Sequence, residues 1–175
     1  MGSFYEFSNF VQPSRYKIFL EVLQGVLRHL DQRPGQGIYC GDMDDDAFLD
    51  AFEHGRLQQH GFGHRDHLRV AWLYVRRYGR DEAVRRAEAG LRALATWHGH
   101  PERYSATRTS VWVGLVAHHL REAPGLGFGE FLERFPRLLD GRLLDAHYSP
   151  ELLATAASRS RPVDPDRLPL PATAS

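Results

Sequence analysis

The most constraining feature of this sequence is the stretch 62–75, whose apolar and histidine residues recur at the period of an α-helix. Residues spaced three or four apart form one apolar and histidine-bearing face: His64, His67, Leu68, Ala71 and Val75. Residues at that spacing lie on one side of a helix. The charged residues Arg65, Asp66 and Arg69 fall outside this face. The stretch therefore predicts an amphipathic helix whose core-facing side carries two imidazoles, one turn apart.

Similar helical stripes recur along the chain and are separated by residues that end helices. They cover approximately residues 15–30, 44–54, 81–97, 102–121 and 128–135. Ser149-Pro150-Glu151 has the cap, the first-turn proline and the acidic residue of another helix start. No stretch alternates in the manner of a strand. The sequence predicts an all-α fold, an irregular bundle of about five or six helices with an extended, proline-rich C-terminal tail.

Breaks in composition divide the chain into three predicted segments. Residues 1–41 form an N-terminal accessory segment with one amphipathic helix and a glycine- and proline-containing linker, residues 42–158 form the helical core domain, and residues 159–175 form the extended tail. Because the N-terminal helix precedes the core domain, its apolar face is a candidate surface for a second copy of the chain or for a protein partner.

The acidic run 42–46 resembles a calcium-binding loop at first sight. It lacks the central glycine and the closing glutamate of such a loop, and it leads directly into a helix. Acidic side chains are stabilising at a helix N-terminus. The run therefore predicts helix capping rather than ion binding.

The overall composition points to no highly charged partner. The 22 basic and 22 acidic residues cancel to a net charge of +0, and the pI is near 7.2, so neither nucleic acid nor a membrane surface is an expected partner. No apolar run approaches the roughly 20 residues that span a bilayer. The absence of a signal-peptide layout and the single cysteine, Cys40, predict a cytoplasmic location. No phosphate-binding motif occurs, so no nucleotide cofactor is expected.

The pair His64-x-x-His67 is the strongest candidate for chemistry. Side chains three apart on a helix can approach one ion, and imidazole is the commonest ligand of zinc and iron. A catalytic metal normally has three protein ligands, and Glu53 is the candidate third ligand because it ends the preceding helix, one loop away. The alternative is that both histidines are core groups satisfied by hydrogen bonds.

Further polar residues lie where the chain enters the helix predicted at 102–121. They are candidate pocket residues for a small-molecule substrate, or substitute metal ligands: His98, His100, Tyr104, Ser105 and Thr109. If helices alternate in direction, this connection lies at the same end of the bundle as His64. His118 and His119 lie more than three turns further along the same helix and are poor candidates to join the pair.

The motif Phe62-x-His64-x-x-His67-Leu68-x-x-Ala71-Trp72 resembles the common stretch of a family of small, uncharacterised, all-helical bacterial proteins. The similarity extends through Tyr104, Thr107, Thr109 and Trp112 to His147-Tyr148-Ser149 and the segment Pro165-Asp166 to Leu168-Pro169. It covers most of residues 44–171. The family has no established activity, so the resemblance implies a pattern and no reaction.

One departure from the family pattern bears on function. Where the family has a His-Glu pair, this chain has Ser105 and Ala106. The resemblance implies a metal site in which that pair joins the two helix histidines, and this chain lacks it. The expected function is therefore a metal-dependent enzyme, or a degenerate relative of one, with iron or zinc held by His64, His67 and Glu53. The alternative is a non-catalytic interaction or accessory protein with structural core histidines.

Overall fold

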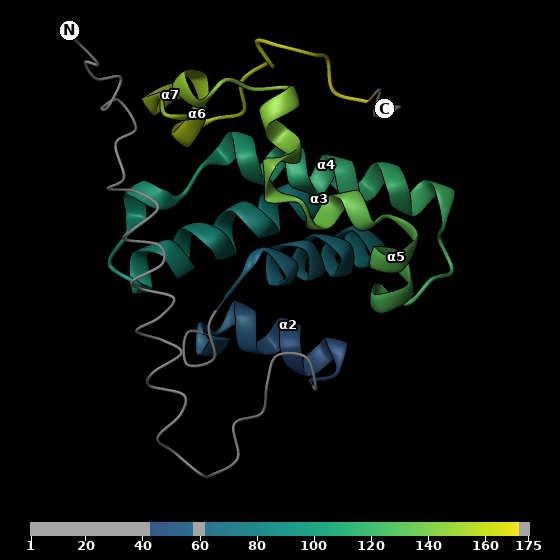
Figure 1. The fold of residues 1–175 in the computed structure, drawn as a ribbon. Helices are drawn as coiled ribbons and strands as arrows, with labels where there is room; N and C mark the ends of the chain where they lie inside the picture. Colours follow the sequence, from purple (N-terminus) through teal and green to yellow (C-terminus); the bar gives the residue numbers. More distant parts are fainter. Residues whose placement is uncertain (1–42, 58–61, 172–175) are drawn as a thin grey trace, which may run out of the picture. The chain divides into compact units, whose positions relative to one another are not determined.

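A computed structural model describes residues 43–57 and 62–171 (Figure 1). Within these ranges every regular element is a helix and none is a strand, which confirms the predicted all-α fold. None of the described helices is long and apolar enough to cross a membrane. The helix predicted at 15–30, the linker that follows it and Cys40 lie outside the described residues, so the three-segment division stays a prediction.

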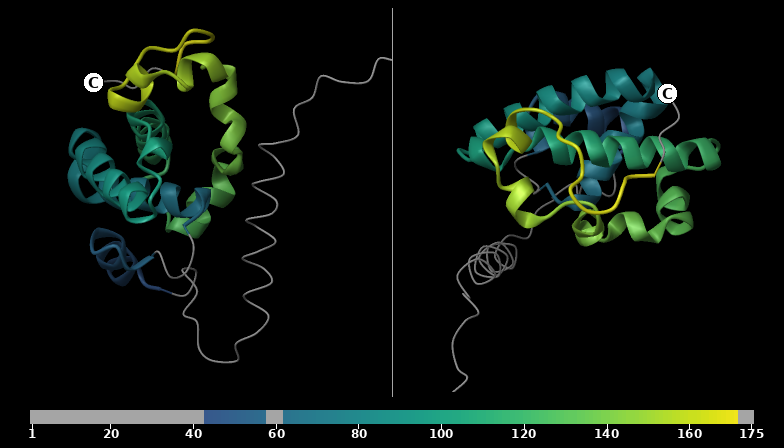
Figure 2. Two further views of the ribbon diagram at one scale, coloured as in Figure 1. Left: turned by 90° about the vertical axis from the view of Figure 1, so that its left-hand side faces the viewer. Right: turned by 90° about the horizontal axis from the view of Figure 1, so that it is seen from above.

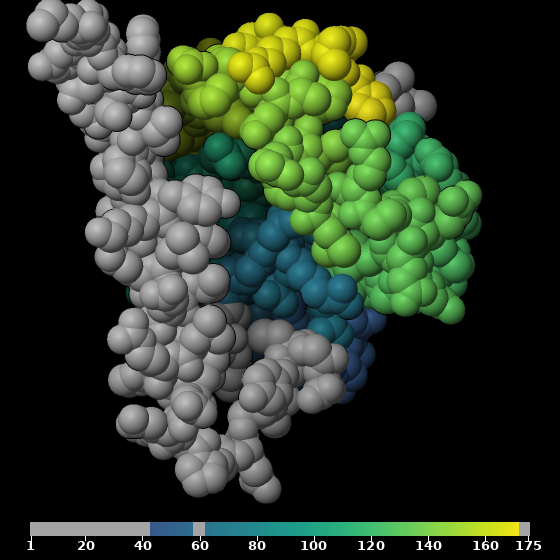
Figure 3. Space-filling model, in the orientation of Figure 1, coloured from purple at the N-terminus to yellow at the C-terminus, as the bar shows by residue number. Residues whose placement is uncertain are grey.

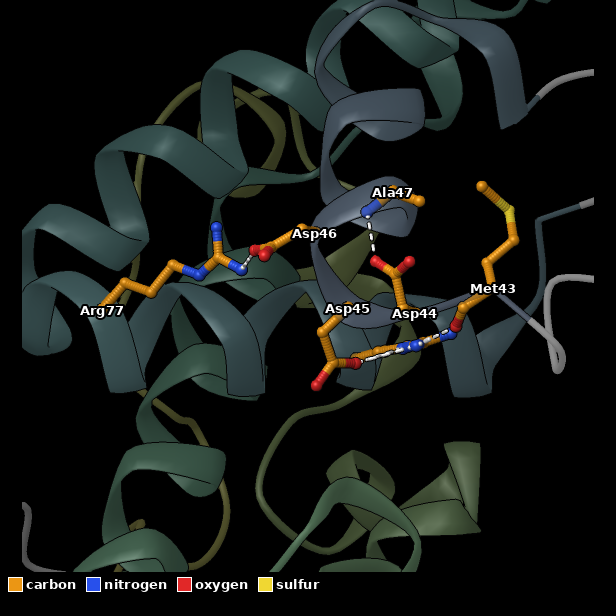
Figure 4. Close-up of polar contacts among 7 residues, drawn as sticks. Met43, Asp44, Asp45, Asp46, Ala47 and Arg77 are labelled. Carbon is orange, nitrogen blue, oxygen red and sulfur yellow. Dashed lines mark hydrogen bonds and ion pairs between the residues drawn. The ribbon is translucent and has the colours of Figure 1, made fainter.

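Helix α2 (Asp45–Glu53) begins at the acidic run, and the prediction of capping is confirmed. The Asp44 carboxylate accepts a hydrogen bond from the Ala47 amide at 2.8 Å. The next two acidic residues bind arginines of the following helix (Figure 4): Asp46 pairs with Arg77, and Asp45 accepts from Arg69 at 2.8 Å. The acidic run thus both starts α2 and fastens it to its neighbour.

Helix α3 (His64–Trp97) is broken at Gly79, which lies between the two helical stretches predicted at 62–75 and 81–97. Gly79 has φ +75° and ψ 173°, a conformation that is essentially restricted to glycine. The residues before and after it therefore form two helical segments of different direction, as the sequence predicts. The first carries the histidine pair, and the second begins with Arg80.

Helices α3 and α4 (Ala106–Glu122) make the most extensive contact between elements, and α2 packs on α3 (Figure 1). The largest fully buried side chains come from all three helices and from the segments that follow: Phe48, Phe52, Leu57, Leu68, Val70, Trp72, Tyr74, Val113, Phe131, Leu138, Leu144 and Tyr148. Burial of this apolar surface supplies the main stabilisation of the bundle.

The predicted start of α4 near residue 102 is wrong by four residues. Residues Pro101–Arg103 form a separate 3-10 turn, η2, and Ser105 is the N-cap of α4. The Ser105 hydroxyl accepts a hydrogen bond from the Arg108 amide at 3.3 Å. The spacing of apolar residues does not reveal this cap. Polar residues of the first turn are buried here, and a pattern based on apolar residues does not count them as core-facing.

The chain after α4 continues in short helices and an extended segment. The elements are α5 (Phe128–Arg134), η3 (Pro136–Leu139), η4 (Gly141–Ala146), α6 (Pro150–Leu153) and α7 (Ala156–Ser160). Ser149 caps α6 as predicted, but the helix ends at Leu153 because Thr155 caps α7. The C-terminal segment, residues 161–171, contains no helix and runs over the side of the unit that carries α4 (Figure 2). Figure 3 shows it at the top of one face, next to the light-green segment that follows α5.

Candidate functional site

His64 lies at the start of α3, where it joins three elements. The Asp66 carboxylate accepts from the Gly63 amide at 2.8 Å and fixes the first turn. His64 Nε2 lies 2.8 Å from the carbonyl oxygen of Leu138 in η3, so Nε2 carries the proton and donates to it. The His64 ring also meets the ring of Trp112 in α4 edge-on, with centroids 4.6 Å apart. The imidazole therefore links α3, α4 and η3.

His67 follows one turn later and is partly buried against Phe62, with ring centroids 4.6 Å apart. Burial, together with the neighbouring His64, lowers the pKa of His67 to about 4. Its ring is therefore neutral at physiological pH. Within the described part of the chain no hydrogen bond reaches this ring, so its ordering depends on packing.

Glu53 lies at the exposed C-terminal end of α2 and faces a different turn of α3. Its carboxylate accepts a hydrogen bond from the Tyr74 hydroxyl at 2.9 Å. Burial and this carboxylate raise the pKa of Tyr74. Tyr74 lies two turns beyond His67, about 10 Å along the helix. Among the described residues no three histidine, cysteine or acidic side chains are close enough to hold one metal ion, so Glu53 does not complete a ligand set with His64 and His67.

The remaining candidates lie at the other end of α3 and at the start of α4. His98 and His100 are exposed beyond α3, and His100 pairs with Glu102 at 3.2 Å. The guanidinium carbon of Arg92 lies over the ring of Tyr104, 4.6 Å from the ring centroid. None of the described contacts brings these residues to the histidine pair.

Ser105 and Thr109 are buried and serve the start of α4. The Thr109 hydroxyl donates to the Ser105 carbonyl oxygen at 3.0 Å, and the Ser105 hydroxyl donates to the Ser158 carbonyl oxygen at 3.2 Å. Ser105 is the position at which the resemblance described above leads us to expect a histidine. In this chain the smaller side chain caps the helix and ties it to α7, and a histidine would not fit both roles.

A pocket that the sequence analysis missed lies between α4 and the C-terminal segment, and its volume is about 170 Å³. Its apolar walls include Val111, Leu115, Val163 and Leu170. Its polar residues are Arg80, Ser110, His118, Tyr148 and Asp164. We call it the α4–tail pocket. No periodic pattern could have revealed it, because one wall is a non-helical segment with no sequence repeat.

Hydrogen bonds hold the C-terminal wall of the pocket in place. The Thr107 hydroxyl accepts from the Val163 amide at 3.2 Å, and the Tyr148 hydroxyl donates to the Val163 carbonyl oxygen at 3.1 Å. Further along, Asp166 accepts from the Ser149 amide at 2.8 Å and from its hydroxyl at 2.5 Å. These bonds to the Ser149 amide and hydroxyl lower the pKa of Asp166. The segment is thus fixed at both sides of the pocket.

Two residues that line the pocket have side-chain donors without an acceptor within the described residues. Arg80 Nε is buried and makes no hydrogen bond. The carboxylate nearest to the terminal nitrogens of Arg80 is that of Asp81. It lies 3.8 Å from Nη1, which exceeds hydrogen-bonding distance. The hydroxyl of Ser110, half-buried in the middle of α4, also makes no hydrogen bond among these residues. His118, in contrast, pairs with Glu122: its Nε2 lies 3.2 Å from the carboxylate oxygen Oε1.

The fold and the pocket define a small all-helical protein with a preformed cavity. No family model, curated protein or solved structure matches the chain. The resemblance to the uncharacterised helical family therefore stays a prediction.

Proposed function

We propose that this protein binds a small organic molecule in the α4–tail pocket. The observation that carries the proposal is a pocket with apolar walls that is also lined by Arg80 and Ser110, whose side chains make no hydrogen bond among the described residues. Ligand sites combine these features: apolar walls supply affinity, and a few polar groups fix orientation. A cavity of about 150 Å³ accepts a benzene ring in another protein, so a monocyclic ligand suits the 170 Å³ here.

Filling the pocket is expected to abolish binding. The probes are benzoate, benzamide and benzylamine, titrated into the full-length protein and followed by calorimetry. Ser110→Phe places a ring in the cavity, and Leu170→Trp does so from the opposite wall, so the test stands if one variant fails to fold. We expect binding of at least one probe to the natural protein and a loss of at least tenfold in either filled variant.

Two controls separate filling from general damage to α4. Ser110→Ala leaves the space open and removes only the hydroxyl, so it should weaken binding far less than Ser110→Phe does. Arg108→Phe adds the same ring to an exposed position of α4, outside the pocket, and should change nothing. If no probe binds the natural protein, or if Arg108→Phe removes binding as Ser110→Phe does, the proposed pocket function is wrong.

A metal ion at the histidine pair is the second candidate, and the contact between His64 and Leu138 favours it. Metal-binding imidazoles usually donate their other ring N–H to a carbonyl or carboxylate. Because Nε2 of His64 donates to Leu138, Nδ1 would be the ligand atom. His67, neutral at physiological pH, would be the second ligand.

This candidate predicts about one equivalent of zinc or iron that survives gel filtration. His64→Ala and His67→Ala should each abolish it, because a single remaining imidazole cannot hold the ion. The measurement is elemental analysis by mass spectrometry of the natural protein and both variants. Metal that persists in either variant would show that it is bound elsewhere, and natural protein purified without metal after loading would rule the site out.

A further inference from the structure

The break in α3 places a cationic side chain at the α4–tail pocket. Gly79, with φ +75°, ends the first segment of α3, and Arg80 begins the second. Arg80 is 40% exposed as a side chain, so its charge is partly hydrated, yet its Nε is buried without an acceptor. This Nε is therefore out of reach of a ligand in the pocket, and the donors that a ligand could meet are the terminal N–H groups, which make no hydrogen bond among the described residues.

The arginine is better suited to an anion than the other polar groups of the pocket. A guanidinium presents parallel N–H donors that match the two oxygens of a carboxylate. Asp81 is the only described carboxylate within 4 Å of the Arg80 nitrogens, and at 3.8 Å it accepts no hydrogen bond from them. Ser110 adds an uncommitted hydroxyl on the α4 wall. Both residues line the same pocket.

The apolar walls limit the rest of the ligand. Val111 and Leu115 belong to α4, whereas Val163 and Leu170 belong to the C-terminal segment. In a space of about 170 Å³ they leave room for one ring or a short branched chain beside the anionic group. Asp164, exposed at the pocket, disfavours a ligand with further negative charge. This argues for a single carboxylate rather than a multiply charged phosphate.

We infer that the α4–tail pocket binds a small monocarboxylate with a compact apolar body, and that Arg80 is its carboxylate-binding residue. This inference rests on the proposed function and specifies its ligand class. It predicts that the pocket discriminates charge at constant shape. Benzoate should bind at least tenfold more tightly than benzamide, because a hydrogen bond to a charged group is stronger than a neutral one.

Substitution of Arg80 tests the assignment. In Arg80→Gln, benzoate affinity should fall at least tenfold, while benzamide affinity should stay within about twofold. Arg80→Lys keeps the charge and loses the paired donors, so its benzoate affinity should lie between those of the natural protein and Arg80→Gln. Arg85→Gln is the matched control: Arg85 lies on the same segment of α3, exposed, paired with Glu82 and outside the pocket. It should leave benzoate binding unchanged.

Each outcome separates the ligand class from the pocket itself. If benzamide or benzylamine binds as tightly as benzoate, or if Arg80→Gln leaves benzoate binding unaltered, the carboxylate assignment is wrong and the pocket remains. If Arg85→Gln weakens benzoate as much as Arg80→Gln does, the preference reflects overall charge and the assignment is equally overturned. If none of the three probes binds, the proposed function fails as well. Circular dichroism and melting of each variant confirm that it is folded.

Discussion

Acidification from pH 7 to pH 4.5 is expected to destabilise the protein by about 2 kcal/mol through His67 alone. The pKa of this imidazole is about 4 in the folded chain, below its ordinary value of 6.5. The unfolded chain therefore binds a proton in this window that the folded chain does not. The resulting stability is fully present above pH 6.5 and is lost as the pH falls toward 4.

Urea denaturation of metal-free protein at several pH values between 7 and 4.5 measures this effect, and His67→Gln is the comparison. Glutamine is polar and does not titrate, so the variant should lose most of the slope in this window. Carboxylates with lowered pKa values, such as Asp140 and Asp166, act mainly below it. Equal slopes in the two proteins would show that His67 titrates normally and that the described packing around it is wrong.

Gly90→Ala is expected to destabilise the protein by about 2 kcal/mol, although alanine is the better helix former. A Cβ at Gly90 in α3 would lie 2.5 Å from Cε1 and 2.6 Å from Cζ of Phe52 in α2. Phe52 is only 1% exposed, and its ring stacks on Phe62 with centroids 5.6 Å apart. The ring therefore cannot move aside without disturbing the aromatic cluster near the histidine pair.

Gly129→Ala provides the matched control for this prediction. Gly129 lies in α5, exposed, with no atom within 4 Å of a Cβ built there, so alanine should stabilise the helix by up to about 1 kcal/mol. Phe52→Leu places a smaller side chain at the clash. The double variant Gly90→Ala with Phe52→Leu should therefore lose less free energy of unfolding than the sum of the two single changes. Urea denaturation gives all four values. If Gly90→Ala is as stabilising as Gly129→Ala, α2 does not pack on α3 at this point.

Much of the helical fold follows from local sequence. The stretch 62–75 has a clear apolar period, and Asp44, Gly79 and Ser149 mark helix ends by local backbone chemistry. The start of α4 does not follow, because Ser105 and Thr109 are buried there by contacts with residues about fifty positions away or with their own helix. Burial of such polar groups depends on tertiary partners and not on period.

The candidate site was predictable only in part. Periodicity places His64 and His67 together at the start of α3, and the structure does so. It cannot show that the partner of His64 is the carbonyl of Leu138, which comes from a 3-10 turn far along the chain. The adjacency of Glu53 in sequence suggested a third ligand, but its side chain faces Tyr74. The α4–tail pocket was missed because Arg80, Ser110 and Val163 come from three unrelated local patterns.

We propose that the small organic ligand binds in the α4–tail pocket and not at the histidine pair. The most direct test is an amide correlation spectrum of the isotope-labelled full-length protein during titration with benzoate. We predict that the largest shifts belong to Ser110, Val111 and Val163, and that they disappear in Arg80→Gln. Largest shifts at His64, His67 and Trp112 instead, or no saturable shifts at all, would contradict the claim.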